Sequence, residues 1–356
     1  MIATYSIQQW LFADAPGRYD IDLAESGVQF QRLKDLHLDP EWELDYSLDR
    51  GIAALRSGVA DLYGRPVHDD HAVITHGAQE ALYLLYRCAL APGDHVVTTS
   101  PGWQQSWEVP AHIGCEVSVL PTRPGPPFDA EALARLITPR TKLLVLNSPG
   151  NPSGYCFSER DWSVILDVAR AHDLIVVNDE EYLLDFAESI VHRYPKALSV
   201  SGLSKVYGLP ALRIGWAFGM PEVIARMVNY KRYTTVSNSW VWERVAVDVL
   251  HERDRHIRRY REFVDGGIDR LRAFADEYAD RLRLVPPANT PYAWFDLHAS
   301  ISSQVLAERL LDEQRVLVMP AEVFGSAAGL RISYARPAAV LDEGLSRLGK
   351  LIAQLD

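Results

Sequence analysis

Between residues 72 and 218, short apolar and β-branched runs alternate with amphipathic stretches and turn-rich connectors. There are seven such runs, at 72–75, 95–99, 116–120, 142–146, 174–178, 197–201 and 214–218. Short apolar runs separated by helical patterns are typical of a largely parallel sheet that is covered by helices on both faces. We therefore expect an α/β fold whose large domain is built on a mostly parallel, seven-stranded sheet.

Beyond about residue 222 the pattern changes. A long helical region covers 223–278, with a break expected near 234–238, and strand-like segments follow at 292–297, 316–319 and 330–334. The last helix repeats apolar residues three and four apart, which gives one buried face; these are Leu341, Leu345, Leu348, Ile352 and Leu355. This order predicts a smaller α+β domain. We expect an N-terminal arm (1–45) joining the small domain, a large domain (46–235), and an interdomain helix with the small domain (236–356).

Composition and charge narrow the possible partners. The 356 residues carry a formal net charge of -11, whereas nucleic acids and anionic membranes demand a basic face. No apolar run approaches the length of a membrane span, and residues 1–17 lack the pattern of a secretory signal. Three widely spaced cysteines indicate reduced thiols rather than a disulfide framework. We expect a soluble, cytoplasmic protein that binds neither nucleic acid nor membrane.

Polar side chains follow several of the predicted strands, where parallel sheets form their ligand sites. Lys205 comes after the sixth run beside small residues, and Asp179 and Tyr182 end the fifth run three residues apart. Asn151 belongs to the turn-rich stretch 147–154, after the fourth run. Pyridoxal phosphate chemistry needs a lysine for a Schiff base, a carboxylate for the pyridine nitrogen, and a phenol or amide for the ring oxygen.

The same chemistry needs a phosphate cup, a stacking ring and a group that grips an amino-acid carboxylate. The stretch Gly77-Ala78-Gln79 opens a helix, whose first N–H groups can bind a phosphate. Trp103 follows the second run and offers a stacking face, although a core position is the more usual interpretation of such a tryptophan taken alone. Arg331 stands among apolar residues and needs a partner, which a substrate carboxylate would supply.

Taken in order, these motifs resemble the fold type I pyridoxal-phosphate enzymes, specifically the class I/II aminotransferase family, over nearly the whole chain. The resemblance implies that Lys205 is the Schiff-base lysine and that Asp179 pairs with the pyridine nitrogen. It further implies that Tyr182 and Asn151 bind the ring oxygen, that Trp103 stacks on the ring, and that Arg331 with Asn151 binds the substrate carboxylate. The implied phosphate cup follows Gly77 and consists of Ala78, Gln79, Ser204 and Arg213, with Ser201 or Gly202 nearby. It also implies a homodimer in which Tyr46 reaches the phosphate of the neighbouring subunit.

The chain departs from ordinary transaminases near its N-terminus. Ser26 occupies a position where such enzymes usually have glycine, with Glu25 before it and Gly27 after it. This stretch, together with the stretches 201–215 and 230–235, resembles a narrower branch. That branch contains the capreomycidine synthases and related cyclases, which act on hydroxylated arginines in antibiotic biosynthesis. The resemblance implies that Lys205 removes the α-proton, a β-hydroxyl leaves and a guanidine nitrogen adds to the β-carbon. Glu25 is then the candidate partner of the guanidinium and Glu108 a lesser one, although Glu25 could equally cap or solvate the arm.

Two other reactions on the same cofactor remain open. One is amino-group exchange with a 2-oxo acid, and the other is oxidation or hydroxylation of arginine by oxygen. The sequence speaks against other classes: residues 1–45 are not a basic DNA-binding segment, and neither a dinucleotide-binding glycine motif nor a Gly-x-Ser-x-Gly elbow is present. The stretch His68-Asp69-Asp70-His71 has ligand-type residues but is typical of a polar loop, so we expect no metal site.

Overall fold

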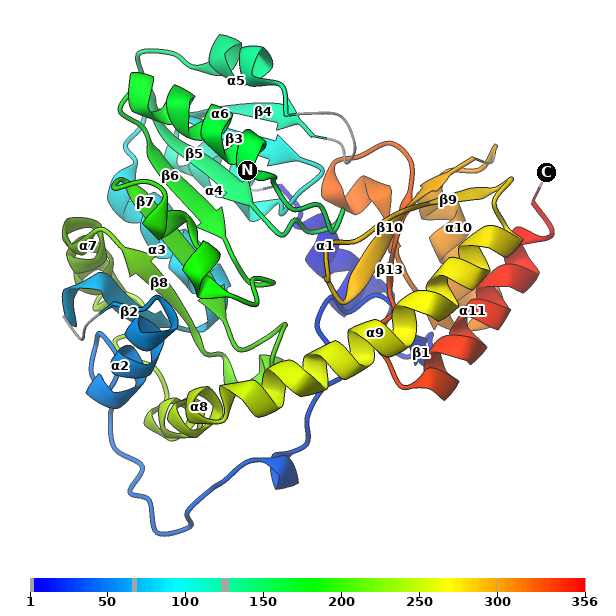
Figure 1. Ribbon diagram of the computed structural model, residues 1–356, viewed down its shortest axis with the longest axis horizontal. Coiled ribbons are helices and arrows are strands. Elements are labelled where there is room, and N and C mark those ends of the chain that lie inside the picture. The colour runs from blue at the N-terminus through cyan, green and yellow to red at the C-terminus, as the bar shows by residue number, and fades with distance from the viewer. Residues whose placement is uncertain (1–2, 66–68, 123–127, 299, 356) are drawn as a thin grey trace.

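The central feature of the computed structural model, which describes residues 3–65, 69–122, 128–298 and 300–355, is a seven-stranded sheet (Figure 1). Its strands run in the order β2 (Ala72–Thr75), β8 (Gly215–Gly219), β7 (Ala197–Gly202), β6 (Ile175–Asp179), β5 (Thr141–Asn147), β3 (His95–Ser100) and β4 (Glu116–Pro121). Both pairings of β8 are antiparallel and all others are parallel. The mostly parallel, seven-stranded sheet expected from the apolar runs is confirmed.

Helices bury both faces of this sheet. The two faces carry separate apolar clusters, because neighbouring residues of a strand point to opposite sides of the sheet. On β5, Val145 belongs to one cluster and Leu144 to the other. The first cluster includes residues of α3 (Gly77–Ala89) and α7 (Pro221–Lys231), and the second includes residues of α5 (Ala130–Leu136) and α6 (Glu159–Ala171). The remaining helices of this region are α2 (Ala53–Leu62) and α4 (Gln105–Ile113).

Two helices lead from this sheet toward the C-terminal elements. The expected break near 234–238 is present, because α7 ends at Lys231 and α8 (Trp240–His251) begins nine residues later; Glu252 then separates α8 from α9 (Arg253–Glu277). Figure 1 shows α9 running from the large sheet to a second, four-stranded antiparallel sheet. That sheet has the order β12 (Met319–Pro320), β13 (Leu330–Ser333), β10 (Tyr292–Leu297) and β9 (Leu282–Val285), with α10 (Ser303–Arg309) and α11 (Ala338–Ile352) beside it.

The N-terminal arm packs against these C-terminal elements. The segment 316–319, expected to be one strand, is two: β11 (Val316–Leu317) pairs with β1 (Ile21–Asp22), and β12 pairs with β13. Val318, between them, uses its carbonyl oxygen to accept a hydrogen bond of 2.9 Å from the Trp10 indole. The arm also forms α1 (Ser6–Gln9) and a π-helical turn (Trp10–Asp14), neither of which was expected. The domain boundaries at 45 and 235 stay predictions.

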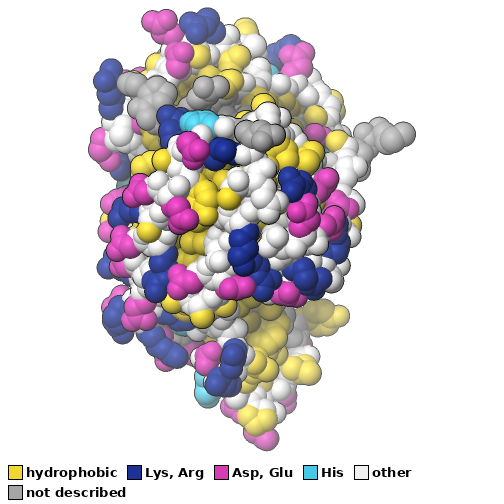
Figure 2. Space-filling view, turned by 90° about the vertical axis from the view of Figure 1, so that its right-hand side faces the viewer, with side chains coloured by type: hydrophobic (Ala, Val, Ile, Leu, Met, Phe, Trp, Pro, Cys, Tyr) yellow, Lys and Arg dark blue, Asp and Glu magenta, His cyan; other side chains and the backbone are white. Residues whose placement is uncertain are grey.

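On the face shown in Figure 2, cationic and anionic side chains are interspersed. Among the described helices, none is long and apolar enough to cross a membrane. The described residues also contain no group of three or more side chains that could hold a metal ion, and His68 lies outside them. The three cysteines are free thiols.

Candidate active site

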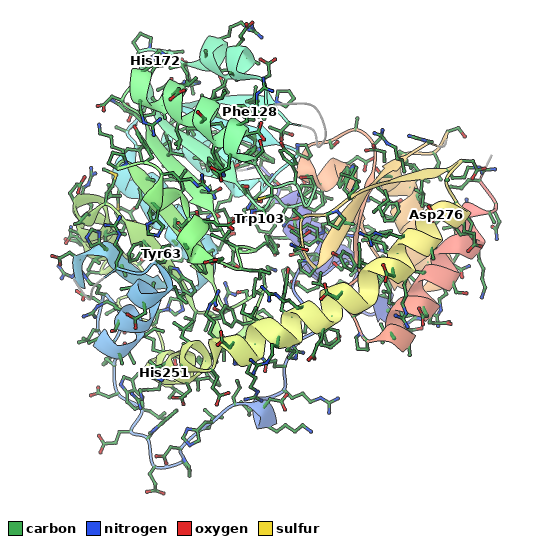
Figure 3. All side chains as sticks on the ribbon, viewed as in Figure 1. Tyr63, Trp103, Phe128, His172, His251 and Asp276 are labelled. Carbon is green, nitrogen blue, oxygen red and sulfur yellow. The ribbon has the colours of Figure 1, made fainter. Side chains whose placement is uncertain are left out.

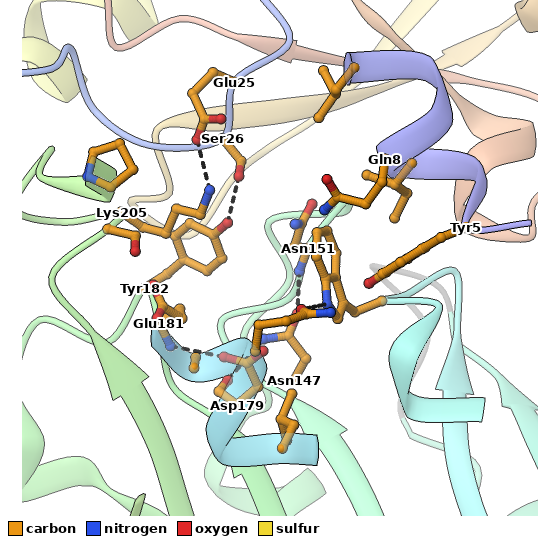
Figure 4. Close-up of a pocket in the computed structure, with 18 of the residues that line it drawn as sticks. Tyr5, Gln8, Glu25, Ser26, Asn147, Asn151, Asp179, Glu181, Tyr182 and Lys205 are labelled. Carbon is orange, nitrogen blue, oxygen red and sulfur yellow. Dashed lines mark hydrogen bonds and ion pairs between the residues drawn. The ribbon is translucent and has the colours of Figure 1, made fainter. Parts of the chain in front are cut away.

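A cavity of about 710 Å³ opens between the carboxyl ends of the central strands, the start of α3 and the N-terminal arm (Figure 4). It lies near Trp103, which Figure 3 places between the large sheet and the C-terminal elements. Most of the site residues expected from the sequence line it: Glu25, Ser26, Ala78, Gln79, Trp103, Asn151, Asp179, Tyr182, Ser204, Lys205, Arg213 and Arg331. Side chains separated by up to about 300 residues in the chain are thus brought into one cavity.

An ion pair in the cavity joins Lys205 to Glu25. Lys205 follows β7, and its Nζ donates a hydrogen bond of 2.7 Å to Glu25 Oε1. Burial alone would raise the pKa of Glu25, but the positive charge and hydrogen bond of Lys205 lower that pKa to about 2. Burial acts against the Lys205 ammonium, yet the charge of Glu25 leaves the lysine pKa above its ordinary value. The two groups are therefore held as an ion pair.

Asp179 ends β6 at the floor of the cavity. Burial raises the pKa of this carboxyl to about 6, and a hydrogen bond of 3.2 Å from the Glu181 backbone N–H opposes the rise. The Asn147 amide fixes the backbone here by donating to the Asp179 carbonyl at 2.8 Å. A carboxyl in this state is a suitable partner for a buried cation such as a protonated pyridine nitrogen.

Two hydrogen-bonding groups stand on the walls of the cavity beside Lys205. The Tyr182 hydroxyl donates to Ser26 Oγ at 2.9 Å, and burial raises the pKa of this phenol to about 12, so it remains a donor. Asn151 is positioned by Asn147, whose Oδ1 accepts a hydrogen bond of 2.6 Å from the Asn151 backbone N–H. Both groups are available to a ligand oxygen within the cavity.

Arg331, on β13, is 2% exposed and has only neutral hydrogen-bond acceptors. Its Nη1 donates to Asn151 Oδ1 at 2.6 Å and its Nη2 to the Ala24 carbonyl, while Nε has no partner among the described residues. The guanidinium lies between the rings of Tyr292 and Phe324, at 5.2 and 5.0 Å. A buried cation without a directly bonded carboxylate is suited to binding an anionic ligand group.

The start of α3 and Arg213 form a second surface that is suited to an anion. Gly77 has φ of +74°, which favours glycine, and a Cβ there would lie 2.6 Å from Arg213 Nη2 and would displace the guanidinium. Arg213 Nη2 donates to the His76 carbonyl at 3.1 Å, and the Trp103 indole donates to Gln79 Oε1 at 2.8 Å. The N–H groups and dipole of a 13-residue helix, beside a guanidinium, suit a phosphate.

Four expected residues do not line the cavity. Gly77 lies behind Arg213, and the Gly27 N–H holds Glu25 by donating to Oε1 at 3.0 Å. Ser201 is buried in β7, where its hydroxyl donates to the Glu180 carbonyl at 3.1 Å. Tyr46 is 83% exposed and pairs through its backbone with Ser239, so its role in a neighbouring subunit stays a prediction.

The structure adds residues that the sequence had not indicated. Asn147 and Glu181 line the cavity from within motifs already identified, and the arm contributes Tyr5, Ile7, Gln8, Leu11 and Phe12. The sequence of the arm shows no helical periodicity, because its α-helix is only one turn long. Glu108, the lesser candidate for a guanidinium partner, lines a neighbouring cavity instead and lies 3.7 Å from His112.

These features fit pyridoxal 5′-phosphate. A lysine, a buried carboxyl, two groups for a ring oxygen, an indole and a phosphate-type cradle converge on one cavity large enough for a cofactor and a substrate. Lys205, Asp179, Tyr182, Asn151 and the start of α3 would hold it.

Comparison with known proteins identifies the family of the chain. The sequence model described as aminotransferase class I and II matches residues 23–348. The chain is 31% identical to capreomycidine synthase of Streptomyces vinaceus, over 92% of this chain and 89% of that protein. It is also 31% identical to the arginine–pyruvate transaminase of Pseudomonas aeruginosa, over 87% and 83%. The solved structure of the PLP-dependent cyclase OrfR superposes with a TM-score of 0.90 at 25% identity, over 99% of this chain and 98% of that chain. The chain therefore belongs to the class I and II aminotransferase family and is a pyridoxal-phosphate-dependent enzyme.

Proposed function

We propose that this enzyme removes the β-hydroxyl of a hydroxylated arginine and closes a ring between a guanidine nitrogen and the β-carbon. The observation that carries the proposal is the Glu25 carboxylate inside the cavity, 2.7 Å from Lys205 Nζ. The net reaction loses one water: the β-C–O bond breaks, a C–N bond forms, and the nitrogen gives up a proton. The α-proton leaves during elimination and is replaced after ring closure.

Glu25 supports this proposal because Lys205, its ion-pair partner, also has to hold the cofactor. When Lys205 holds the cofactor, its nitrogen is no longer an ammonium with three N–H donors. The carboxylate then loses its directly bonded ammonium, and the charges of Arg331 and Arg336 remain nearby. A substrate guanidinium supplies parallel N–H donors that match a carboxylate, and such charge-assisted pairs are the stronger class of hydrogen bond. An arginine-type side chain therefore complements this cavity better than a neutral one.

The roles proposed for the other residues follow from their positions. Arg331 binds the substrate α-carboxylate, and Lys205 takes the α-proton and returns one to the α-carbon at the end. Bound pyridoxal phosphate supplies the electron sink that makes the α-proton acidic. Glu25 lies beside the nitrogen that moves the proton and is the nearest carboxylate to it in the described contacts.

The names of the relatives support the substrate class and the reaction separately. The Pseudomonas relative is named as a transaminase of arginine, which supports an arginine-type substrate. The Streptomyces relative is named capreomycidine synthase and the OrfR structure a cyclase, which supports ring closure. Amino-group exchange with a 2-oxo acid is the second candidate, favoured by the equal 31% identity to the transaminase. Oxidation of arginine by oxygen would use the same residues and would consume oxygen.

We also propose a homodimer that completes the site. Arg213, which faces the expected phosphate position, is exposed in the single chain, and so is Tyr46. A second subunit that covers these residues would enclose the cavity and would place its own Tyr46 there.

Replacing Glu25 by glutamine tests the assignment of the guanidinium partner. The native enzyme is expected to bind arginine about 10- to 100-fold more tightly than citrulline, its neutral isostere, because a charged hydrogen bond is at stake. E25Q is expected to lose most of that preference. Absorbance of the bound cofactor during titration with each amino acid measures both affinities.

The ratio of the two affinities cancels any effect of the substitution on Lys205, since both ligands share the same amino-acid end. E108Q is the matched control, because Glu108 lines the neighbouring cavity, and it should keep the native preference. An unchanged arginine preference in E25Q would show that Glu25 only anchors the arm.

A further inference from the structure

We propose that Glu181 is a further ligand-binding residue of this cavity, a neutral carboxylic acid that donates a hydrogen bond to the bound pyridoxal compound. This inference rests on the family membership and the cavity, and is independent of the cyclisation proposed above. Glu181 stands between Asp179 and Tyr182 in the chain and lines the same cavity as Lys205.

The side chain of Glu181 is placed by close packing. Glu181 is 8% exposed, and its Oε1 lies directly over Gly202 on β7, where a Cβ would be 2.7 Å away. Any larger residue at 202 would displace the carboxyl. The backbone N–H of Glu181 donates to Asp179 Oδ1 at 3.2 Å, which ties the residue to the floor of the cavity (Figure 4).

The second carboxyl oxygen of Glu181 indicates that a ligand binds beside it. This Oε2 is buried and has no hydrogen-bond partner among the described residues. Leaving such a group without a partner is energetically costly, and natural proteins seldom tolerate it. Because Glu181 borders the cavity, a bound molecule is in a position to supply the missing partner.

The surrounding charges decide which form of Glu181 is present. Burial and the neighbouring Asp179 raise the pKa of this carboxyl to about 8, and Glu25 acts in the same direction. Lys205 and Arg213 oppose the rise without cancelling it, and the Tyr182 phenol also faces the group. At neutral pH the carboxyl is therefore mostly protonated and carries an O–H donor. The phosphoryl and ring oxygens of a pyridoxal compound are acceptors.

A bound ligand that accepts this hydrogen bond stabilises the protonated form, so binding must couple to a proton. The affinity for the ligand is therefore highest below the carboxyl pKa of the empty cavity, and it falls as the pH rises above that pKa. With that pKa at about 8, one linked proton weakens binding by about 20-fold between pH 7.5 and pH 9.5.

The test is the affinity of the apoenzyme for pyridoxamine 5′-phosphate, which forms no Schiff base with Lys205, measured by calorimetry across this pH range. The native protein should show the fall of about 20-fold and take up protons on binding at pH 8.5. E181Q keeps a donor but cannot ionise. Between pH 7.5 and pH 9.5 its affinity should therefore fall about 20-fold less than that of the native protein. Titration of the ligand itself affects both proteins alike and cancels in the comparison.

Two further variants complete the design. E181A lacks the donor and should bind about 3- to 10-fold more weakly than the native protein at pH 7.5. E188Q removes an exposed carboxylate outside the cavity and should behave as the native protein does. Circular dichroism verifies that each variant is folded. The proposal is overturned if folded E181Q retains the native pH dependence, or if folded E181A binds as tightly as the native protein.

Discussion

Lys205→Ala is expected to lower turnover by at least about 10⁴-fold and to abolish covalent retention of the cofactor. The substitution removes both the nitrogen that forms the Schiff base and the base that moves the α-proton, and the two losses compound. Lys205 is the lysine that lines the cavity in the described part of the chain, so no neighbouring lysine replaces it. Reduction with borohydride, followed by mass spectrometry of the denatured protein, measures covalent attachment directly.

The matched control for this experiment is Lys196→Ala. Lys196 is partly exposed, pairs with Asp173 at 2.5 Å and lies outside the cavity, so K196A should gain the mass of the reduced cofactor as the native protein does. Labelling of K205A to the native extent would show that another residue carries the cofactor. The assignment of Lys205 would then be wrong.

Arg331→Ala is expected to raise the KM for the amino-acid substrate by about 100- to 1,000-fold while changing the cofactor affinity little. A charged, two-pronged contact with a buried carboxylate is worth a few kcal/mol, and 1.4 kcal/mol corresponds to a factor of ten. Arg331→Lys should recover only part of the loss, because a lysine ammonium cannot make two parallel N–H bonds.

Comparing arginine with agmatine, which lacks the carboxylate, isolates this role from any structural damage. The native enzyme should bind arginine far more tightly than agmatine, and R331A should bind the two about equally. Spectral titration of the bound cofactor gives both constants. If R331A still prefers arginine by the native factor, then the α-carboxylate binds elsewhere in the cavity.

Much of the large sheet could be predicted because most of its strands, unlike the edge strand β4, are buried on both faces. Burial on both faces makes each strand a continuous apolar run, as at Val145 and its neighbours in β5, and such runs are visible without any knowledge of partners. The two-residue strands β1 and β11 could not be predicted, since they are too short for any periodicity and depend on pairing across almost 300 residues.

Part of the candidate site could be predicted from the sequence, and part could not. Asp179, Tyr182 and Lys205 follow strands, and a parallel sheet brings its carboxyl ends to one edge, so their meeting was predictable. The pairing of Glu25 with Lys205 spans 180 residues and was not, because nothing in local spacing determines where the arm returns. Glu181 escaped notice between two expected residues, since its buried state appears only once Gly202 is packed against it.

The most direct test of the proposed reaction is product analysis after incubating the enzyme with 3-hydroxyarginine in deuterated water. Cyclisation predicts a cyclic amino acid lighter by one water, with its α-amino group retained and deuterium at the α-carbon, formed at the same rate with or without a 2-oxo acid. A product that has lost its amino group, with glutamate appearing from added 2-oxoglutarate, would contradict cyclisation and establish transamination instead.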